Sequence, residues 1–406
     1  MSNSTKFRGL MFGVSVLPAL LVMPAMAADD GLAFEDGHSI IENTTITGDV
    51  TGIGTLNIQN SGVDNLAVEM TGSKIAVESA NANGITVNKG STGPVSLQLG
   101  GENTESVNIS VTNITATEES EQQVRALYAY DNANVDVQAK EINISSNWRG
   151  VGAAGTMNEA SDGAKYSSKV SLNADKIDIA TSATENANAS AALLAIEFGQ
   201  IDVNAKDVNL HSTGVLETAV VHVQNNTTDA KDQDTIARID INADNIHIAS
   251  DVDDALAVMS QGILNINGNA FLKGENVLVT RGDAITNINV DGTHTTRMEG
   301  NVNFDYNAPT SGTKINADVN VTLAGADSYW TGNTIASYTG TPDDESFMQV
   351  DSMTLNIQDG AKWNAAAIVD NKGKDSGSYY TALNNLNINN GVVNIQDTER
   401  GITVDN

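Results

Sequence analysis

The chain has 406 residues, no cysteine, 40% hydrophobic but only 4% aromatic residues, and a formal net charge of −30. The absence of cysteine excludes thiol catalysis, disulfide frameworks and cysteine-ligated zinc sites. The acidic balance argues against nucleic acid or an anionic membrane as the main partner, since phosphate binding needs Lys and Arg. The length suits two or three globular domains, or one elongated repeat structure with an aliphatic core.

Residues 1–27 have the three parts of a secretory signal peptide. Lys6 and Arg8 form a short basic region, an apolar run follows, and Ala25 and Ala27 occupy the small-x-small positions that signal peptidase accepts. The apolar run is short for a helix that spans a bilayer. We therefore expect cleavage after Ala27 and export of the remaining chain.

Short period-2 pairs of aliphatic residues dominate residues 28–105, and Asn, Gly, Ser, Thr and Asp fill the gaps between them. This alternation is typical of β-strands with one buried face. Helical periodicity is nearly absent, and only 118–130 and 187–198 are compatible with a turn or two of helix. The pairs, which start nine or ten residues apart, are Leu56/Ile58, Leu66/Val68, Ile75/Val77, Ile85/Val87 and Val95/Leu97/Leu99.

A longer unit, aliphatic-x-aliphatic-x-small-x-x-aliphatic-x-aliphatic, recurs within residues 106–318. Clear copies begin at Val135, Val170, Ile201 and Ile239. Side chains alternate between the two faces of a straight strand, so the step of three residues after the small position would turn the second aliphatic pair outward. A corner that absorbs one residue returns both pairs to the same interior. Strand, corner and strand, repeated about every 30 residues, describe the coil of a parallel β-helix.

A looser copy of this unit begins at Leu264, with Gly268 at the small position and Lys273 at the last aliphatic position. The alternative architecture is a string of antiparallel β-sandwiches, which also have strands every 8–12 residues. Tight hairpin signals are rare, however, and the corner unit persists from 107 to 272. We therefore predict an all-β chain that folds as one elongated parallel β-solenoid, with 28–105 forming its first coils.

The C-terminal segment 319–406 carries a variant of the pattern: an aliphatic strand, a polar turn with glycine, an alanine and then a tryptophan. The copies span 319–332, 353–364 and 383–395, the last without its tryptophan. The pattern resembles the tryptophan-bearing rungs of pertactin-like autotransporter passengers. The resemblance implies a right-handed parallel β-helix that crosses the periplasm of a Gram-negative bacterium. It also implies transport to the cell surface, the outer membrane or the medium by an outer-membrane β-barrel translocator.

The resemblance further implies a non-enzymatic, cofactor-free protein that presents loops for adhesion to a host-cell or matrix receptor, or for self-association. A translocator barrel would need many alternating strands with aromatic girdles. The sequence up to Asn406 does not supply them, so we expect residues 319–406 to lead toward a barrel outside this sequence. A passenger that uses a separate translocator is the alternative.

One triplet suggests an adhesion site. Arg281, Gly282 and Asp283 lie between two strand patterns, so we expect them at the tip of a loop. Some pertactin-like adhesins carry an Arg-Gly-Asp triplet, and the resemblance implies recognition by an integrin-type receptor. An ordinary turn explains the same residues, because Gly and Asp favour turns.

The alternative function is a calcium-dependent, polysaccharide lyase-like enzyme, because parallel β-helices include such lyases. Asp clusters at 229–234 and 251–254 offer the oxygen ligands that Ca²⁺ prefers, but no basic residue is paired with them. The stretch 373–378 is similar to the nucleophile loop of chymotrypsin-like autotransporter proteases. Lys374 interrupts that likeness, and no histidine motif supports a catalytic triad. We therefore predict no catalytic residue, no metal site and no cofactor.

Overall fold

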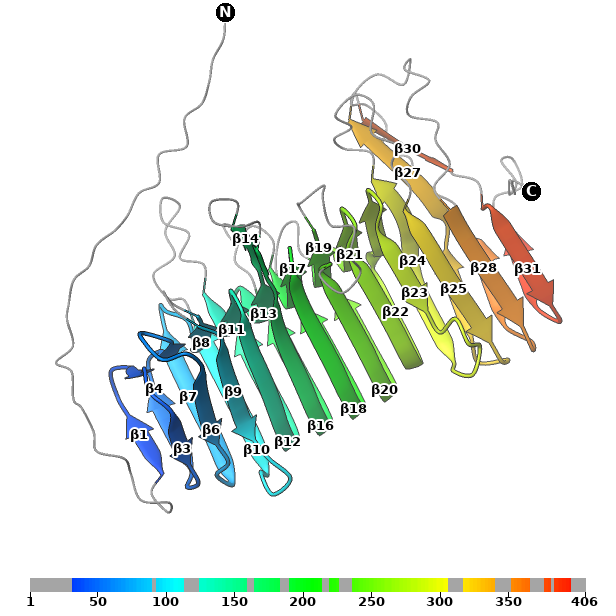
Figure 1. The fold of residues 1–406 in the computed structure, drawn as a ribbon. Coiled ribbons are helices and arrows are strands. Elements are labelled where there is room, and N and C mark those ends of the chain that lie inside the picture. The colour runs from blue at the N-terminus through cyan, green and yellow to red at the C-terminus, as the bar shows by residue number, and fades with distance from the viewer. Residues whose placement is uncertain are drawn as a thin grey trace, which may run out of the picture.

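The computed structural model describes residues 31–89, 93–112, 124–158, 164–182, 190–213, 219–225, 236–305, 317–339, 352–365, 376–380 and 383–395. Within these residues the chain is all β-structure, and its strands stack side by side along one elongated body (Figure 1). The all-β prediction is confirmed. The same residues contain no helix that could cross a membrane. The predicted signal peptide, 1–27, lies outside them.

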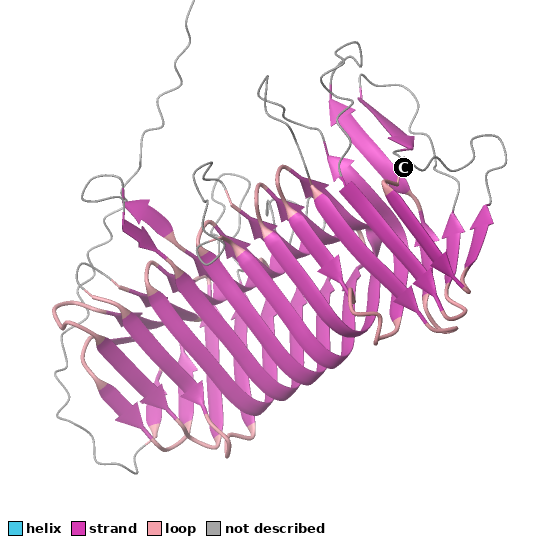
Figure 2. Ribbon diagram, turned by 45° about the vertical axis from the view of Figure 1, so that its right-hand side comes forward, coloured by secondary structure: helices cyan, strands magenta, loops and turns pink. Residues whose placement is uncertain are grey.

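Strands one coil apart pair in parallel, and in the described residues these pairings fall into three ladders that recur in the same order along the chain (Figure 2). Ladder 1 contains β1 (Leu32–Phe34), β4 (Val50–Ile53), β7 (Lys74–Ala80), β10 (Ser106–Thr112), β26 (Tyr329–Gly332), β29 (Lys362–Ala365) and β32 (Val392–Ile395). Ladder 2 contains β2 (His38–Ile40), β5 (Leu56–Gln59), β8 (Ile85–Asn88), β11 (Arg125–Tyr130), β13 (Arg149–Ala154), β17 (Ala191–Ile196), β19 (Ala219–Gln224), β21 (Asp254–Met259) and β27 (Thr334–Thr339). Ladder 3 contains β3 (Thr44–Ile46), β6 (Leu66–Met70), β9 (Val95–Gly100), β23 (Ile285–Ile288), β25 (Asp318–Ala324), β28 (Ser352–Gln358) and β31 (Asn385–Asn389).

Long strands bend from one ladder into the next and so join the ladders into a solenoid-like wall. They are β12 (Ala133–Ser146), β16 (Ser168–Thr181), β18 (Gly199–Ser212), β20 (Arg238–Ser250), β22 (Ile263–Arg281) and β24 (Thr296–Asp305). Strands β12 to β22 pass from ladder 3 into ladder 1, β22 continues into ladder 2, and β24 passes from ladder 1 into ladder 2. Two described pairings are antiparallel: β14 (Thr156–Asn158) with β15 (Ala164–Tyr166), and β27 with β30 (Ser376–Tyr380).

The bends lie where the sequence repeat predicts corners. In β12 the buried Ala139 is followed by two exposed residues, Lys140 and Glu141, and then by the buried Ile142. Strands β16, β18 and β20 have the same pair of exposed residues at the bend, although their alanines are half-buried. Because the chain remains a strand through the bend, the extra residue is absorbed without a loop. The predicted corner and parallel pairing are confirmed, and the antiparallel-sandwich alternative is wrong.

Inward side chains from the three ladders form one aliphatic core. The four aliphatic positions of the repeat copy at 170–179 are at most 1% exposed. Near the C-terminal end, the rings of Trp330 and Trp363 stack with their centroids 5.1 Å apart and an interplanar angle of 6°. Their indole N–H groups donate to the carbonyl oxygens of Gly300 (2.9 Å) and Gly332 (3.1 Å). The tryptophans of the C-terminal pattern are therefore core residues.

The two stretches that are compatible with helix, 118–130 and 187–198, contain a strand and no helix in their described parts. They form β11 and β17, which pair in parallel with β13 in the coil between them. This pairing buries Leu127 completely. Ladder pairing and core burial outweigh the weak helical pattern, as tertiary context commonly does.

Candidate functional site

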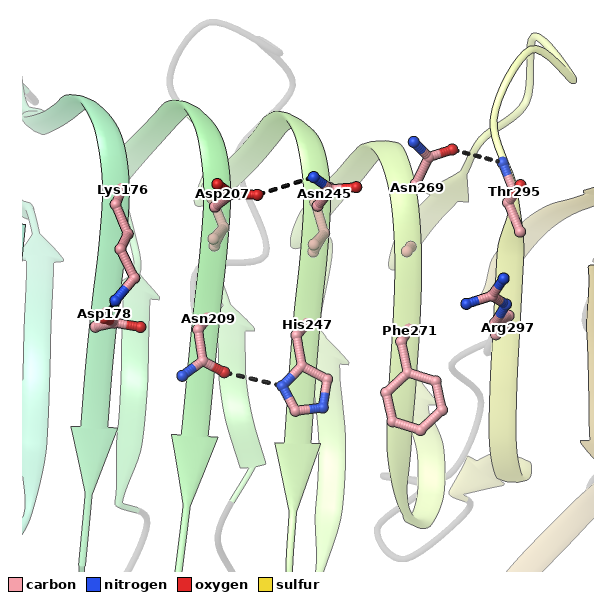
Figure 3. Close-up of a pocket in the computed structure, with 13 residues that line it drawn as sticks. Lys176, Asp178, Asp207, Asn209, Asn245, His247, Asn269, Phe271, Thr295 and Arg297 are labelled. Carbon is pink, nitrogen blue, oxygen red and sulfur yellow. Dashed lines mark hydrogen bonds and ion pairs between the residues drawn. The ribbon is translucent and has the colours of Figure 1, made fainter.

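Outward side chains of ladder 1 form rows along the solenoid. Coils stack in register at a strand spacing of about 4.8 Å, so each coil adds one side chain to each row. The central row consists of Asp178, Asn209, His247, Phe271 and Arg297 (Figure 3). The neighbouring row, nearer the corner, consists of Lys176, Asp207, Asn245, Asn269 and Thr295. Together the two rows line an open hollow of about 580 Å³.

Hydrogen bonds between coils hold the polar side chains of this hollow in place. Asn245 Nδ2 donates to Asp207 Oδ1 over 2.8 Å. His247 Nδ1 and Asn209 Oδ1 lie 2.9 Å apart. Since each bond joins side chains from two successive coils, the stacking of the coils fixes the spacing of the amide, carboxylate and imidazole groups.

An aromatic platform lies in the middle of these polar groups. The rings of His247 and Phe271 stack with centroids 5.2 Å apart and an interplanar angle of 16°. Burial, followed by the charges of His211 and Lys273, lowers the pKa of His247 below its ordinary value of 6.5. The imidazole is therefore neutral at pH 7, and the two rings form a flat surface without charge.

This arrangement has the chemistry of a saccharide-binding surface. The C–H face of a pyranose ring can pack on the platform of His247 and Phe271, which favours apolar contact. Its hydroxyl groups can exchange hydrogen bonds with surrounding amides and carboxylates, which offer both donors and acceptors. Arg297 and the ion pair between Lys176 and Asp178 bound the hollow at its two ends.

In the repeat copy at Ile239, His247 lies between the two inward aliphatic positions, so the repeat predicts that it faces outward. The repeat does not predict the outward position of Phe271. The looser copy at Leu264 predicts that the second aliphatic pair falls at 271 and 273. In the structure the register between β20 and β22 shifts at the corner, where Gly268 has a φ of 150°. Ala270 and Leu272 are buried instead, and Phe271 faces outward. The expected position of this second pair is therefore wrong.

The Arg-Gly-Asp triplet forms a tight turn between strands rather than the tip of a projecting loop. Arg281 is still part of β22, and its Nη1 lies 3.4 Å from Asp305 Oδ2. Gly282 has a φ of 68°, which glycine adopts readily, and the chain enters β23 at Ile285. Of the triplet only Asp283 is exposed. A role of the triplet in adhesion stays a prediction.

The remaining sequence candidates are not assembled into a site in the described part of the chain. Residues 229–234, 373–375 and the predicted cleavage site at Ala25 and Ala27 lie outside that part. The Asp cluster at 251–254 lies inside it, and the described residues contain no group of three His, Asp or Glu side chains that could hold a metal ion.

Asp254 provides a test of burial at the edge of ladder 2. Burial raises the pKa of its carboxyl to about 7, although Asn276 Nδ2 donates a 2.8 Å hydrogen bond to it. The ionised carboxylate therefore destabilises the fold above pH 7, and this cost disappears as pH falls below about 4, where the carboxyl is protonated in both states. We expect Asp254→Asn to raise the free energy of unfolding by about 2–4 kcal/mol at pH 8 and by little at pH 3.5. Urea unfolding at both pH values checks this.

The matched control for this experiment is Asp244→Asn at an exposed corner position. We expect a change within about 0.5 kcal/mol at either pH, since isolated surface substitutions rarely do more. An equal effect of Asp254→Asn at pH 8 and pH 3.5 would show that the carboxyl is not buried.

The ladders and the outward rows define a parallel, solenoid-like β-protein with a polar and aromatic surface on one side. No family model, curated protein or solved structure matches this chain.

Proposed function

We propose that the chain is a non-enzymatic passenger of the pertactin-like autotransporter type, folded as a right-handed parallel β-helix. It is exported through the periplasm of a Gram-negative bacterium and displayed at the cell surface or released into the medium by an outer-membrane β-barrel translocator. Its outer surface adheres to saccharides of a host cell or matrix. The observation that carries the adhesion proposal is the hollow on ladder 1, with the stacked rings of His247 and Phe271 at its centre.

The export part of the proposal is supported by the sequence at both ends. Residues 1–27 have the pattern of a cleaved signal peptide, and 319–395 resemble passenger rungs. The parallel stacking of coils suits this route, because each coil contacts mainly its neighbours and can form as the chain emerges from a pore. A chain without cysteine also passes such a pore without disulfides that would have to be broken.

The adhesion part is supported by the mismatch between Phe271 and its surroundings. An outward phenylalanine on a polar sheet gains little for folding, whereas a ring held flat among amides and carboxylates suits the mixed apolar and polar faces of a sugar. The hollow is open and crosses five coils, from β16 to β24, so it suits an extended saccharide chain.

We expect Phe271→Ala to weaken saccharide binding at least about tenfold, the loss that follows from removing an aromatic contact of about 1.4 kcal/mol. The measurement is binding of purified residues 28–406 to immobilised glycans, followed by titration calorimetry with the glycan that binds most tightly. Asn267→Ala is the control, because this exposed residue lies on the same strand but on ladder 3.

Unchanged binding of the Phe271→Ala protein would remove the hollow from the proposal. If the wild-type protein binds no glycan, no host cell and no matrix, and does not aggregate bacteria that display it, the adhesion proposal fails as a whole.

The Arg-Gly-Asp triplet is tested separately by Asp283→Ala. We expect any integrin-dependent cell adhesion to fall several-fold, because Asp283 is the exposed carboxylate of the triplet, while glycan binding stays unchanged. Counting attached cells with and without a soluble Arg-Gly-Asp peptide measures this. Equal attachment of both proteins would leave the triplet as an ordinary turn.

A further inference from the structure

Two arginines are stacked on ladder 2, away from the hollow on ladder 1. Arg125 begins β11 and Arg149 begins β13, and the two are register partners in adjacent coils. Parallel pairing places their backbones about 4.8 Å apart. Like charges directly opposite on neighbouring strands repel each other. The whole chain has only 21 Lys and Arg residues against 51 Asp and Glu residues.

Aromatic rings hold both guanidinium groups. Cζ of Arg149 lies 3.6 Å from the ring centroid of Trp148, and Cζ of Arg125 lies 4.2 Å from that of Tyr128 and 5.2 Å from that of Trp148. Trp148 is only 3% exposed and packs into the hydrophobic core. Stacking occupies the flat face of a guanidinium, whereas its N–H groups lie at the edge, where an oxyanion accepts paired hydrogen bonds.

The surroundings disfavour the positive charge of both groups. Burial lowers the pKa of Arg125, and burial together with the charge of Arg125 lowers the pKa of Arg149 to about 9. Arg125 Nε is buried and makes no hydrogen bond. None of the ion pairs between described residues involves Arg125. Burial raises the pKa of Tyr128, the charges of Arg125 and Arg149 oppose this shift, and the charges of Asp131 and Glu197 add to it.

The positive potential extends farther along ladder 2. Burial lowers the pKa of His222 to about 4, and the charges of Arg149 and Arg281 contribute to the same shift although Gln224 opposes it. Arg281 is itself paired with Asp305.

We propose that Arg125 and Arg149 form a binding site for the carboxylate or sulfate groups of an acidic polysaccharide. One oxyanion between the two guanidinium groups would accept hydrogen bonds from both and remove their mutual repulsion. Trp148 and Tyr128 position the two arginines by holding their flat faces. This site is separate from the hollow, and its ligand is anionic whereas the hollow suits neutral sugars.

The probes are dextran sulfate, polygalacturonate and neutral dextran of similar length, titrated into purified residues 28–406 at low salt. We expect both acidic polymers to bind, with an affinity that falls as salt rises, and dextran to show no salt-sensitive binding. The double variant Arg125→Gln/Arg149→Gln should lose at least tenfold in affinity. Arg149→Lys, which keeps the charge but not the planar fork, should lose part of it.

Arg238→Gln is the control for removing an arginine elsewhere, because Arg238 lies on ladder 3 and is paired with Asp240 at 2.5 Å. It should change the affinity less than twofold, and so should Phe271→Ala in the hollow. The double variant should melt no lower than the wild type, because it loses a buried like-charge pair.

Binding of only one acidic polymer would identify its oxyanion, carboxylate or sulfate, as the ligand and support the site. Failure of both acidic polymers to bind the wild-type protein would overturn the proposal. Equal affinity of the folded double variant and the wild type would do the same. Loss of neutral glycan binding in Phe271→Ala concerns only the hollow and leaves this test unaffected.

Discussion

Val203→Asp is expected to unfold the central coils, whereas Asn204→Asp, one residue later, is expected to change stability little. Val203 is fully buried, and an aspartate there would be an unpaired charge inside the core. The expected cost is at least about 4 kcal/mol. Asn204 faces outward, where its Nδ2 donates a hydrogen bond to Asn173 Oδ1 over 3.2 Å. Losing this hydrogen bond should lower the free energy of unfolding by about 0.5–1 kcal/mol. Urea unfolding followed by circular dichroism measures both.

This pair of variants isolates side-chain direction, because the new residue is the same and the backbone positions are adjacent. Similar destabilisation by both would mean that β18 has no buried and exposed face. The alternation on which the three ladders depend would then be absent.

Trp330→Ala is expected to cost about 3–5 kcal/mol, the range for removing a large buried aromatic side chain. The variant loses the stack on Trp363 and the hydrogen bond to the Gly300 carbonyl oxygen. Because each coil contacts mainly its neighbours, the loss should be local. Amide hydrogen exchange measured by mass spectrometry should therefore show faster exchange in β24, β26 and β29, and unchanged exchange in β12 and β16.

Trp330→Phe separates the two contributions, since it keeps a ring in the stack but removes the indole N–H. We expect its free energy of unfolding to lie between those of the wild type and Trp330→Ala. Uniformly faster exchange along the whole chain would contradict the local coupling of coils, and an unchanged rate near Gly300 would contradict the buried stack.

The corner repeat made most of the wall predictable. The step of three residues between Ala139 and Ile142 already required a bend, because two inward pairs cannot otherwise share one interior. The structure places two exposed residues in that step, as required. The many asparagines at outward positions also have a physical reason, because the side-chain amide of one asparagine can form a hydrogen bond with the equivalent asparagine one coil away. Asn242 with Asn204 (3.5 Å) and Asn267 with Asn242 (2.9 Å) illustrate this.

The hollow was less predictable because its rows are assembled across coils of unequal length. His247 and Phe271 meet only because 24 residues separate these register partners, and because the corner at Gly268 shifts the pairing. Arg125 and Arg149 are also register partners 24 residues apart. In both cases the length of the coil decides which side chains become neighbours, and no local sequence pattern predicts that length.

The most direct test of the account is disulfide formation between Asn209→Cys and His247→Cys, because the chain has no cysteine of its own. The two residues are register partners in adjacent coils and belong to the central row of the hollow. We predict rapid, complete cross-linking under mild oxidation, since backbones about 4.8 Å apart suit a disulfide. The pair Asn209→Cys and Asn245→Cys, offset by two residues, should cross-link slowly. Efficient cross-linking of the offset pair, or none of the register pair, would contradict the stacking of coils on which both proposed sites depend.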